Sequence, residues 1–289
     1  MRITLTSAAL TAAADTQGGE LVSLKAQSGT EYIWQGDPAF WTGRNPHLFP
    51  VVGSLKDGKV DINGQDCEMA RHGFARKSAF TLAEQTADSV TLELRENPDT
   101  LSRYPFPFIF RVRHRLLENG FSTAFLVENP GQTPMPFCVG AHTAINCPLA
   151  EGERFEDYEL VFDQPEDADT LLLNAQGLIQ AGQREPMMHA GKVALNYDTF
   201  RRLDTIIFQD LKSQNVSLRH KRTGRGVSLD FSQFPMVAFW TPGGPFLCME
   251  PWHGCAALTD ETGRVQDKPH VITLAPGEKK ELAYTFTIL

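Results

Sequence analysis

Apolar and polar residues alternate in short runs along the whole chain, and this two-residue period predicts β-strands. Clear examples are SVTLELR (89–95), FIFRVRHRLL (108–117) and ELAYTFTIL (281–289). About fifteen or more such runs follow one another, separated by clusters of glycine, proline, asparagine and aspartate. The pattern predicts a chain that consists almost entirely of strands.

Turn signals are strong and helix signals are few. Asn63-Gly64 and Asn119-Gly120 are predicted hairpin turns, because a type I′ turn needs positive φ at both central residues. Segment 97–105 (NPDTLSRYP) is the best candidate for one or two helical turns. No sustained 3.6-residue apolar period, internal repeat or low-complexity linker occurs elsewhere.

The number of strands and the scarcity of helices decide the fold class. Without a helical layer, the apolar faces of the strands must pack sheet on sheet. Proline and glycine are spread evenly instead of being pooled at a boundary. We therefore expect one large antiparallel β-sandwich domain, all-β with few short helices, that spans residues 1–289.

The charge balance and the cysteines limit the possible partners and compartment. The chain has 27 basic and 35 acidic side chains, a net charge of −8 that disfavours nucleic acid and anionic membranes. No apolar stretch approaches the roughly 20 residues of a membrane span, and the N-terminus lacks the apolar core of a signal peptide. Five cysteines without a CxxC pair indicate reduced thiols, a cytoplasmic location and no zinc-binding spacing.

Four polar residues interrupt runs that otherwise indicate buried strands or aromatic turns. They are Arg44 in WTGRNPHLFP, His72 in RHGFAR, His142 in VGAHTAINCP and Glu250 in FLCMEPWHG. Burying an unpaired charge or imidazole is costly, so we expect the four to share a purpose. A cleft where they meet would hold an acid, a base and fixed donors, which suits proton transfer on a small polar substrate.

These motifs and their flanks resemble the aldose 1-epimerase (galactose mutarotase) superfamily, in particular its short bacterial members. The matching segments are EYIWQGDPAFWTGRNPHLFPVVGSL, RHGFARKSAF, FCVGAHTAINCPL and FLCMEPWHGCAALTD, in the right order along nearly the whole chain. The resemblance implies a β-supersandwich and the interconversion of hexose anomers without a cofactor. Thr143 stands where many relatives have proline, which leaves the neighbouring imidazole in place.

The resemblance also implies the roles of the acid and the base. Mutarotation opens a cyclic hemiacetal, rotates the C1–C2 bond and recloses the ring. Glu250 matches the family's base, which takes the proton from the C1 hydroxyl, and His142 matches the acid that protonates the ring oxygen. With ordinary pKa values of about 4.3 and about 6.5, we expect an ionised glutamate facing an imidazolium.

Further residues are expected to bind the sugar. His72 matches the family's second histidine, which bonds the ring oxygen or a hydroxyl, and Arg44 offers a rigid fork of donors. The family's sugar-binding aspartate is assigned to Asp204, with Asp210 as the alternative. The aromatic residues that could stack on a pyranose, although packing is their commoner role, are Trp34, Trp41, Phe246 and Trp252.

The remaining histidines receive weaker assignments. His47, which is close to Arg44 in sequence, is expected at the rim of the cleft. His253 lies three residues after Glu250, which could indicate a metal pair, but Pro251 argues against the helix that would align the two residues. The last four are expected at the surface, namely His114, His189, His220 and His270.

Three alternatives stay open. The substrate could be a hexose 6-phosphate, held by Arg71, Arg76 and Lys77. The protein could instead be a non-catalytic carbohydrate-binding or sensing sandwich. A glycosidase is a weaker possibility, because no second carboxylate accompanies Glu250. Neither the identity of the sugar nor the choice between monomer and homodimer follows from the sequence.

Overall fold

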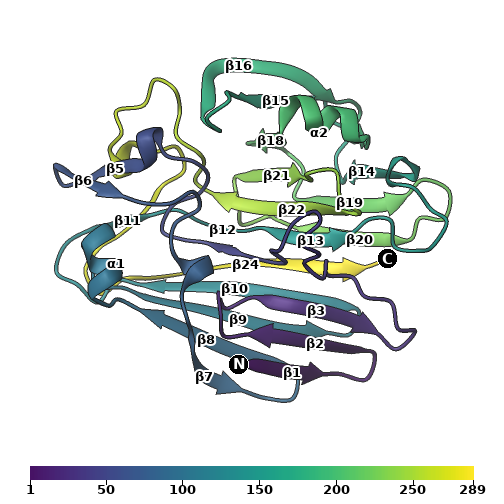
Figure 1. Cartoon of the computed structure of the whole chain (residues 1–289), viewed down its shortest axis with the longest axis horizontal. Helices are drawn as coiled ribbons and strands as arrows, with labels where there is room; N and C mark the ends of the chain where they lie inside the picture. Colours follow the sequence, from purple (N-terminus) through teal and green to yellow (C-terminus); the bar gives the residue numbers. More distant parts are fainter.

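A computed structural model describes all 289 residues and confirms the predicted mostly antiparallel β architecture (Figure 1). The largest sheet has nine strands. In spatial order they are β17 (Lys192–Ala194), β14 (Tyr158–Phe162), β19 (Asn215–His220), β20 (Gly226–Asp230), β24 (Lys279–Ile288), β10 (Gly120–Glu128), β9 (Ile109–Leu117), β8 (Ser89–Arg95) and β7 (Thr81–Gln85).

A second sheet of six strands carries the candidate site. Its path is β18 (Thr205–Gln209), β21 (Met236–Trp240), β22 (Phe246–His253), β12 (Val139–Ala141) and β4 (His47–Leu48), and β13 (Thr143–Asn146) also pairs with β22. Every pairing in this sheet is antiparallel. Strand β22 therefore lies at the centre of the sheet, with β21 on one side and β12 and β13 on the other.

Smaller elements complete the fold. A three-stranded sheet contains β1 (Arg2–Thr6), β2 (Leu10–Asp15) and β3 (Leu21–Ala26). The two-stranded sheets are β5 (Lys59–Ile62) with β6 (Gln65–Glu68), β11 (Met135–Phe137) with β23 (Ile272–Leu274), and β15 (Ala168–Leu173) with β16 (Ile179–Met188). Two short helices are α1 (Pro98–Arg103) and α2 (Tyr197–Leu203), and neither meets the length and hydropathy of a bilayer-crossing helix.

The two large sheets share one apolar core of 63 buried residues. Phe110 and Phe125 enter it from the nine-stranded sheet, and Leu247 and Met249 enter it from β22. Successive side chains of a strand point to opposite faces, so Glu250 and its even-numbered neighbours on β22 face away from this core. The alternation places a buried carboxyl on the outer face of the six-stranded sheet.

The local predictions were mostly right. Helix α1 lies within segment 97–105, where Asn97 caps it by accepting a hydrogen bond from the Thr100 N–H. Asn63 and Gly64 both adopt positive φ between β5 and β6, as a type I′ turn requires. The second Asn-Gly prediction was wrong by one residue, because Leu117 pairs with Gly120 and the turn residues are 118 and 119.

Candidate active site

Glu250 lies on the outer face of β22, fully buried at 1% exposure. It is opposite Ala238 of β21, a small residue that leaves room above the strand. Its Oε2 accepts a hydrogen bond from the indole N–H of Trp252, two residues along on the same face, at 3.2 Å. The sheet and this bond together fix the direction of the carboxyl group.

His142 occupies the single-residue gap between β12 and β13, next to the same central strand. Its Nε2 lies 3.3 Å from Oε1 of Glu250. Its Nδ1 is buried and has no hydrogen-bond partner. The rings of Trp41 and Trp240 flank the imidazole, with ring centroids 5.0 and 5.5 Å away. The acid–base pair expected from the sequence is therefore in direct contact beside an aromatic wall.

His72 is the second imidazole of the site, with its ring centroid 5.6 Å from that of His142. Its backbone has a φ of 68°, and its Nδ1 accepts a hydrogen bond from the Gly53 N–H at 3.1 Å. An imidazole that accepts at Nδ1 carries its proton on Nε2 when it is neutral. Burial and the nearby His142, Arg71 and Arg76 lower the pKa of His72 well below 6.5, so it presents a neutral Nε2–H donor.

Burial changes the expected charges of Glu250 and His142. It lowers the pKa of His142 to about 3, and the positive charges of Arg71 and Arg76 act in the same direction. Burial also raises the pKa of Glu250 well above 4.5, although Arg71 and the Trp252 hydrogen bond oppose it. The unliganded site thus favours a protonated carboxyl and a neutral imidazole, which corrects the expectation of a glutamate anion facing an imidazolium.

Asp204 lies at the site, and its neighbours show why. It ends α2 with a φ of 63°, and its carboxylate is 3.9 Å from the guanidinium of Arg71. The indole N–H of Trp240 donates to its Oδ1 at 3.4 Å. The negative charge of Asp204 also helps to raise the pKa of Glu250. Arg71 and Trp240 are parts of the site that the sequence did not single out for this role.

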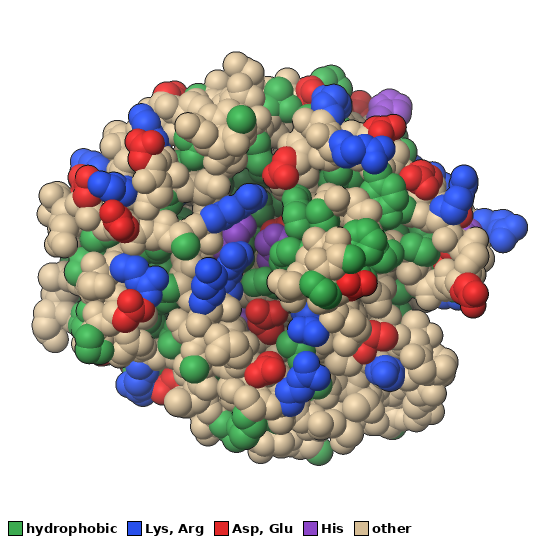
Figure 2. All heavy atoms as spheres, viewed as in Figure 1, with side chains coloured by type: hydrophobic (Ala, Val, Ile, Leu, Met, Phe, Trp, Pro, Cys, Tyr) green, Lys and Arg blue, Asp and Glu red, His purple; other side chains and the backbone are tan.

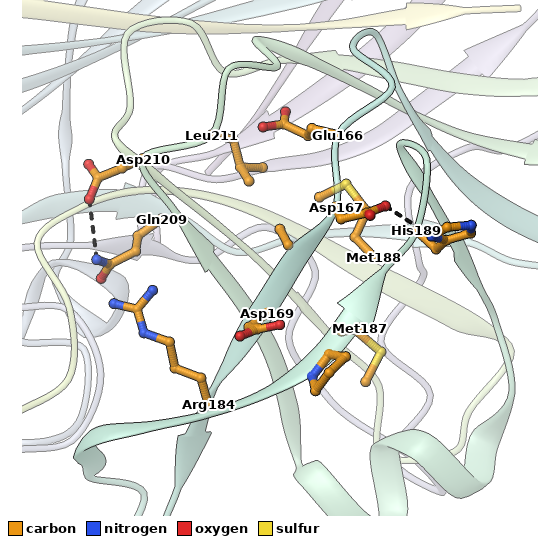
Figure 3. A pocket seen from close by; sticks show the side chains of 12 residues that line it. Glu166, Asp167, Asp169, Arg184, Met187, Met188, His189, Gln209, Asp210 and Leu211 are labelled. Carbon is orange, nitrogen blue, oxygen red and sulfur yellow. Dashed lines mark hydrogen bonds and ion pairs between the residues drawn. The ribbon is translucent and has the colours of Figure 1, made fainter.

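Asp210 follows β18, whereas Asp204 precedes it, so the two aspartates lie at opposite ends of one strand. Asp210 lines a separate hollow with Glu166, Asp169 and Arg184 (Figure 3). In that view its carboxylate points toward the side-chain amide of Gln209, which donates to it at 3.2 Å. This geometry favours Asp204 over Asp210 as the aspartate of the candidate site.

Arg44 is held by a backbone group of the preceding loop. Its Nη2 donates to the backbone oxygen of Gln35 at 2.7 Å, and its Nε is buried without a partner. Its charge acts on Glu20, whose pKa burial raises to about 7 while Arg44, Arg76 and a hydrogen bond from the Asn45 N–H oppose the rise. Glu20 had no sequence motif, because it follows an ordinary Gly-Gly turn.

Several histidine assignments were wrong. His47 is not at a rim and His114 is not at the surface, because both are fully buried with Nε2 against the carbonyl oxygen of Gly19, at 2.9 and 2.8 Å. His220 is also buried, at 6% exposure, and its Nδ1 accepts backbone N–H groups. His189 is exposed as expected. His47 and His114 both bond to a backbone group far along the chain, so the local sequence gave no signal for their burial.

The outer face is hollowed at the site. Figure 2 shows histidine atoms at the floor of a hollow near the centre of the view, with Lys and Arg side chains along one side and hydrophobic side chains along the other. The contacts described above give the same division, with Arg71 and Arg76 near the imidazoles and Trp41 and Trp240 flanking His142. The hollow therefore combines imidazoles with basic side chains on one side and an apolar wall on the other.

Comparison with known proteins found a matching family model and several similar chains. Residues 1–287 match the protein-family model described as aldose 1-epimerase. The chromosomal protein LacX of Lactococcus lactis subsp. lactis is 37% identical over 299 residues, covering all of both chains.

Two solved structures are also similar. A galactose mutarotase related enzyme from Lactobacillus acidophilus has a TM-score of 0.95 at 29% identity, covering 100% of this chain and 97% of that one. A galactose mutarotase-like protein from Lactobacillus casei has a TM-score of 0.92 at 26% identity, covering all of both chains. The galactose mutarotase-like fold expected from the sequence is confirmed.

Proposed function

Because the chain belongs to the aldose 1-epimerase family, we propose that it interconverts the α and β anomers of a hexose, with Glu250 as base and His142 as acid. The observation that carries the proposal is the 3.3 Å contact between His142 Nε2 and Glu250 Oε1 beside the central strand of the six-stranded sheet. The C1 hydroxyl oxygen and the ring oxygen of a pyranose are bonded to the same carbon. Two adjacent proton-transfer groups can therefore reach both of them.

The pair needs only one proton to work. A protonated Glu250 with a neutral His142 contains the same proton as a carboxylate with an imidazolium, and the short contact permits transfer between them. After that transfer, Glu250 takes the C1 hydroxyl proton while the electrons of the O–H bond form the C1 carbonyl. The bond from C1 to the ring oxygen breaks, and His142 protonates that oxygen.

Ring opening returns the pair to the arrangement that burial favours, a neutral imidazole and a protonated carboxyl. Rotation about the C1–C2 bond then exposes the other face of the carbonyl, and the same proton transfers in reverse close the ring. No external proton donor is consumed in the cycle. The neutral ground state therefore supplies one acid and one base in both directions.

The surrounding groups can bind and orient the sugar. His72 offers its Nε2–H to the ring oxygen or an adjacent hydroxyl, and the exposed carboxylate of Asp204 can accept hydroxyl hydrogens. Trp41 and Trp240 flank His142 and can cover the apolar face of a pyranose. Arg44, whose Nη2 is held by the backbone oxygen of Gln35, is the proposed donor to further sugar hydroxyls.

Polarimetry on freshly dissolved α-D-glucose or α-D-galactose tests the proposal. The wild-type protein should accelerate the decay of optical rotation above the buffer rate. Glu250→Gln and His142→Asn should each slow anomer exchange by about two to four orders of magnitude, the usual scale for acid–base catalysis. His189→Asn is the matched control, since it removes an exposed histidine. Wild-type decay at the buffer rate for both sugars would refute the proposal for them.

A hexose 6-phosphate is the second candidate substrate. Its support is the pair of cations, Arg71 and Arg76, whose charges both act on His72 and His142. A coupled assay that compares glucose with glucose 6-phosphate separates the two substrates, and Arg76→Gln should weaken only the phosphorylated one. A sugar that binds in calorimetry while its anomers exchange at the buffer rate would instead indicate a non-catalytic binding protein.

A further inference from the structure

A thiol that the proposed reaction does not use lies next to Glu250 and His142. Cys248 precedes Glu250 by two residues on β22, so strand alternation places both side chains on the same face. The thiol is fully buried. One ligand atom each from His142, Cys248 and Glu250 lie within 4.8 Å of one another. We propose that these three side chains form a site for a thiophilic divalent cation, zinc above all, which blocks the acid–base pair when it binds.

The distances fit a tetrahedral ion. Zinc bound to nitrogen and oxygen at about 2.0–2.1 Å separates the two ligand atoms by about 3.3–3.4 Å. His142 Nε2 and Glu250 Oε1 are already 3.3 Å apart. A zinc–sulfur bond of about 2.3 Å requires the sulfur to lie about 3.5 Å from the other ligands. The sulfur therefore has to come at most about 1.3 Å closer to the other two ligand atoms.

The donor set selects the kind of metal. A thiolate, an imidazole and a carboxylate suit zinc and its spectroscopic substitute cobalt, whereas magnesium and calcium prefer oxygen ligands alone. Three protein ligands leave a fourth position for water, as in zinc sites that remain open to solvent. On binding, the protons of the Cys248 thiol and of the Glu250 carboxyl pass to solvent, and the two groups enter as thiolate and carboxylate.

The groups behind the ligands indicate reversible binding. The indole N–H of Trp252 holds the second oxygen of Glu250 at 3.2 Å, which orients one ligand. Nδ1 of His142, in contrast, is buried without any acceptor, and metal-binding histidines normally donate from their second nitrogen. The missing bond weakens the site, so the metal acts as an exchangeable inhibitor and not as a permanent structural ion.

Sequence spacing did not reveal this site. Cys248 and Glu250 are separated by one residue, and His142 comes from a different segment more than a hundred residues away. The pairing of β13 with β22 brings the two segments together, with Thr143 opposite Met249.

Titration of the metal-free wild-type protein with Co²⁺, followed by absorption, tests binding without any activity assay. The expected result is a 1:1 complex with d–d bands of a tetrahedral ion and a thiolate-to-cobalt charge-transfer band in the near ultraviolet, all abolished by Zn²⁺. Cys248→Ser should lose the charge-transfer band and bind Zn²⁺ at least about 100-fold more weakly. Cys67→Ser removes a buried thiol of another sheet and should retain wild-type binding.

The inhibition rests on the proposed function, whereas the metal binding does not. In polarimetry, Zn²⁺ should inhibit the wild-type protein over the concentration range of the binding curve, and added monosaccharide should raise that concentration. Each variant is compared with its own metal-free rate, and Cys248→Ser should need at least about 100-fold more Zn²⁺. A wild-type cobalt spectrum without a thiolate band, or equal Zn²⁺ affinity in Cys248→Ser, would overturn the metal site. Metal binding through Cys248 in a protein that does not exchange anomers would overturn only the proposed function.

Discussion

The buried His114 makes a defined contribution to the pH dependence of stability. Its Nε2 bonds the Gly19 carbonyl at 2.8 Å and its Nδ1 lies 2.9 Å from the Thr123 hydroxyl. Burial lowers its pKa from 6.5 to about 4. Between pH 6.5 and pH 4, His114 is therefore protonated in the unfolded chain but neutral in the folded protein. The stability contribution is fully present above pH 6.5 and is lost progressively as the pH falls toward 4.

The magnitude follows from these two pKa values. Between pH 7.5 and pH 5.5, preferential protonation of the unfolded state at one such histidine lowers the free energy of unfolding by about 1.3 kcal/mol. His114→Gln removes the titrating group and retains an amide that can donate to Gly19. The variant should therefore lose about 1.3 kcal/mol less than the wild type over this pH range. The neighbouring His47 remains neutral in both proteins, because burial lowers its pKa to about 3.

Urea unfolding at both pH values measures this difference. Free energies are compared at one urea concentration inside the transitions, which avoids the error of extrapolation to water. His189→Gln controls for the loss of an exposed histidine. Equal pH dependence in the wild type and His114→Gln would show that His114 takes up its proton in the folded state, which would refute the argument.

Two further predictions concern the sugar site and its support. Asp204→Asn should lower kcat/KM about tenfold, which is the scale of one hydrogen bond to a charged group. Asp210→Asn should leave kcat/KM unchanged. Equal effects of the two substitutions in steady-state polarimetry would show that Asp204 has no special role in binding the sugar. Gly73→Ala should lower the melting temperature far more than Gly64→Ala. Both glycines have positive φ, but only at Gly73 would an added Cβ lie 2.2 Å from a backbone atom, the carbonyl oxygen of Phe49. Equal shifts in thermal unfolding would show that the clash is relieved.

The sequence predicted the strands well because their signal is local. Alternation of apolar and polar residues occurs within each strand, and Asn63-Gly64 has the conformational freedom that its turn requires. Helix α2 was missed because it is only seven residues long, too short for a helical period. Its buried residues, Phe200 and Leu203, form a single turn-length pair, and only the capping Asn196 marked its start.

The candidate site was predictable where a polar residue interrupts an apolar segment. His142 and Glu250 stand out in this way, and the fold brings them into contact. Arg71, Trp240 and Glu20 have no such setting, and their importance depends on neighbours from other strands and loops. Charge states were the least predictable feature, because burial sets the pKa values of the pair and depends on the completed fold.

A crystal structure of the protein with a bound monosaccharide is the most direct test of the shared acid–base pair. We expect one pyranose on the outer face of the six-stranded sheet, with its C1 hydroxyl and ring oxygen within about 3.2 Å of the Glu250 carboxyl and the His142 imidazole. A sugar that binds only in the hollow beside Asp210, or that turns its reducing end away from Glu250 and His142, would contradict it.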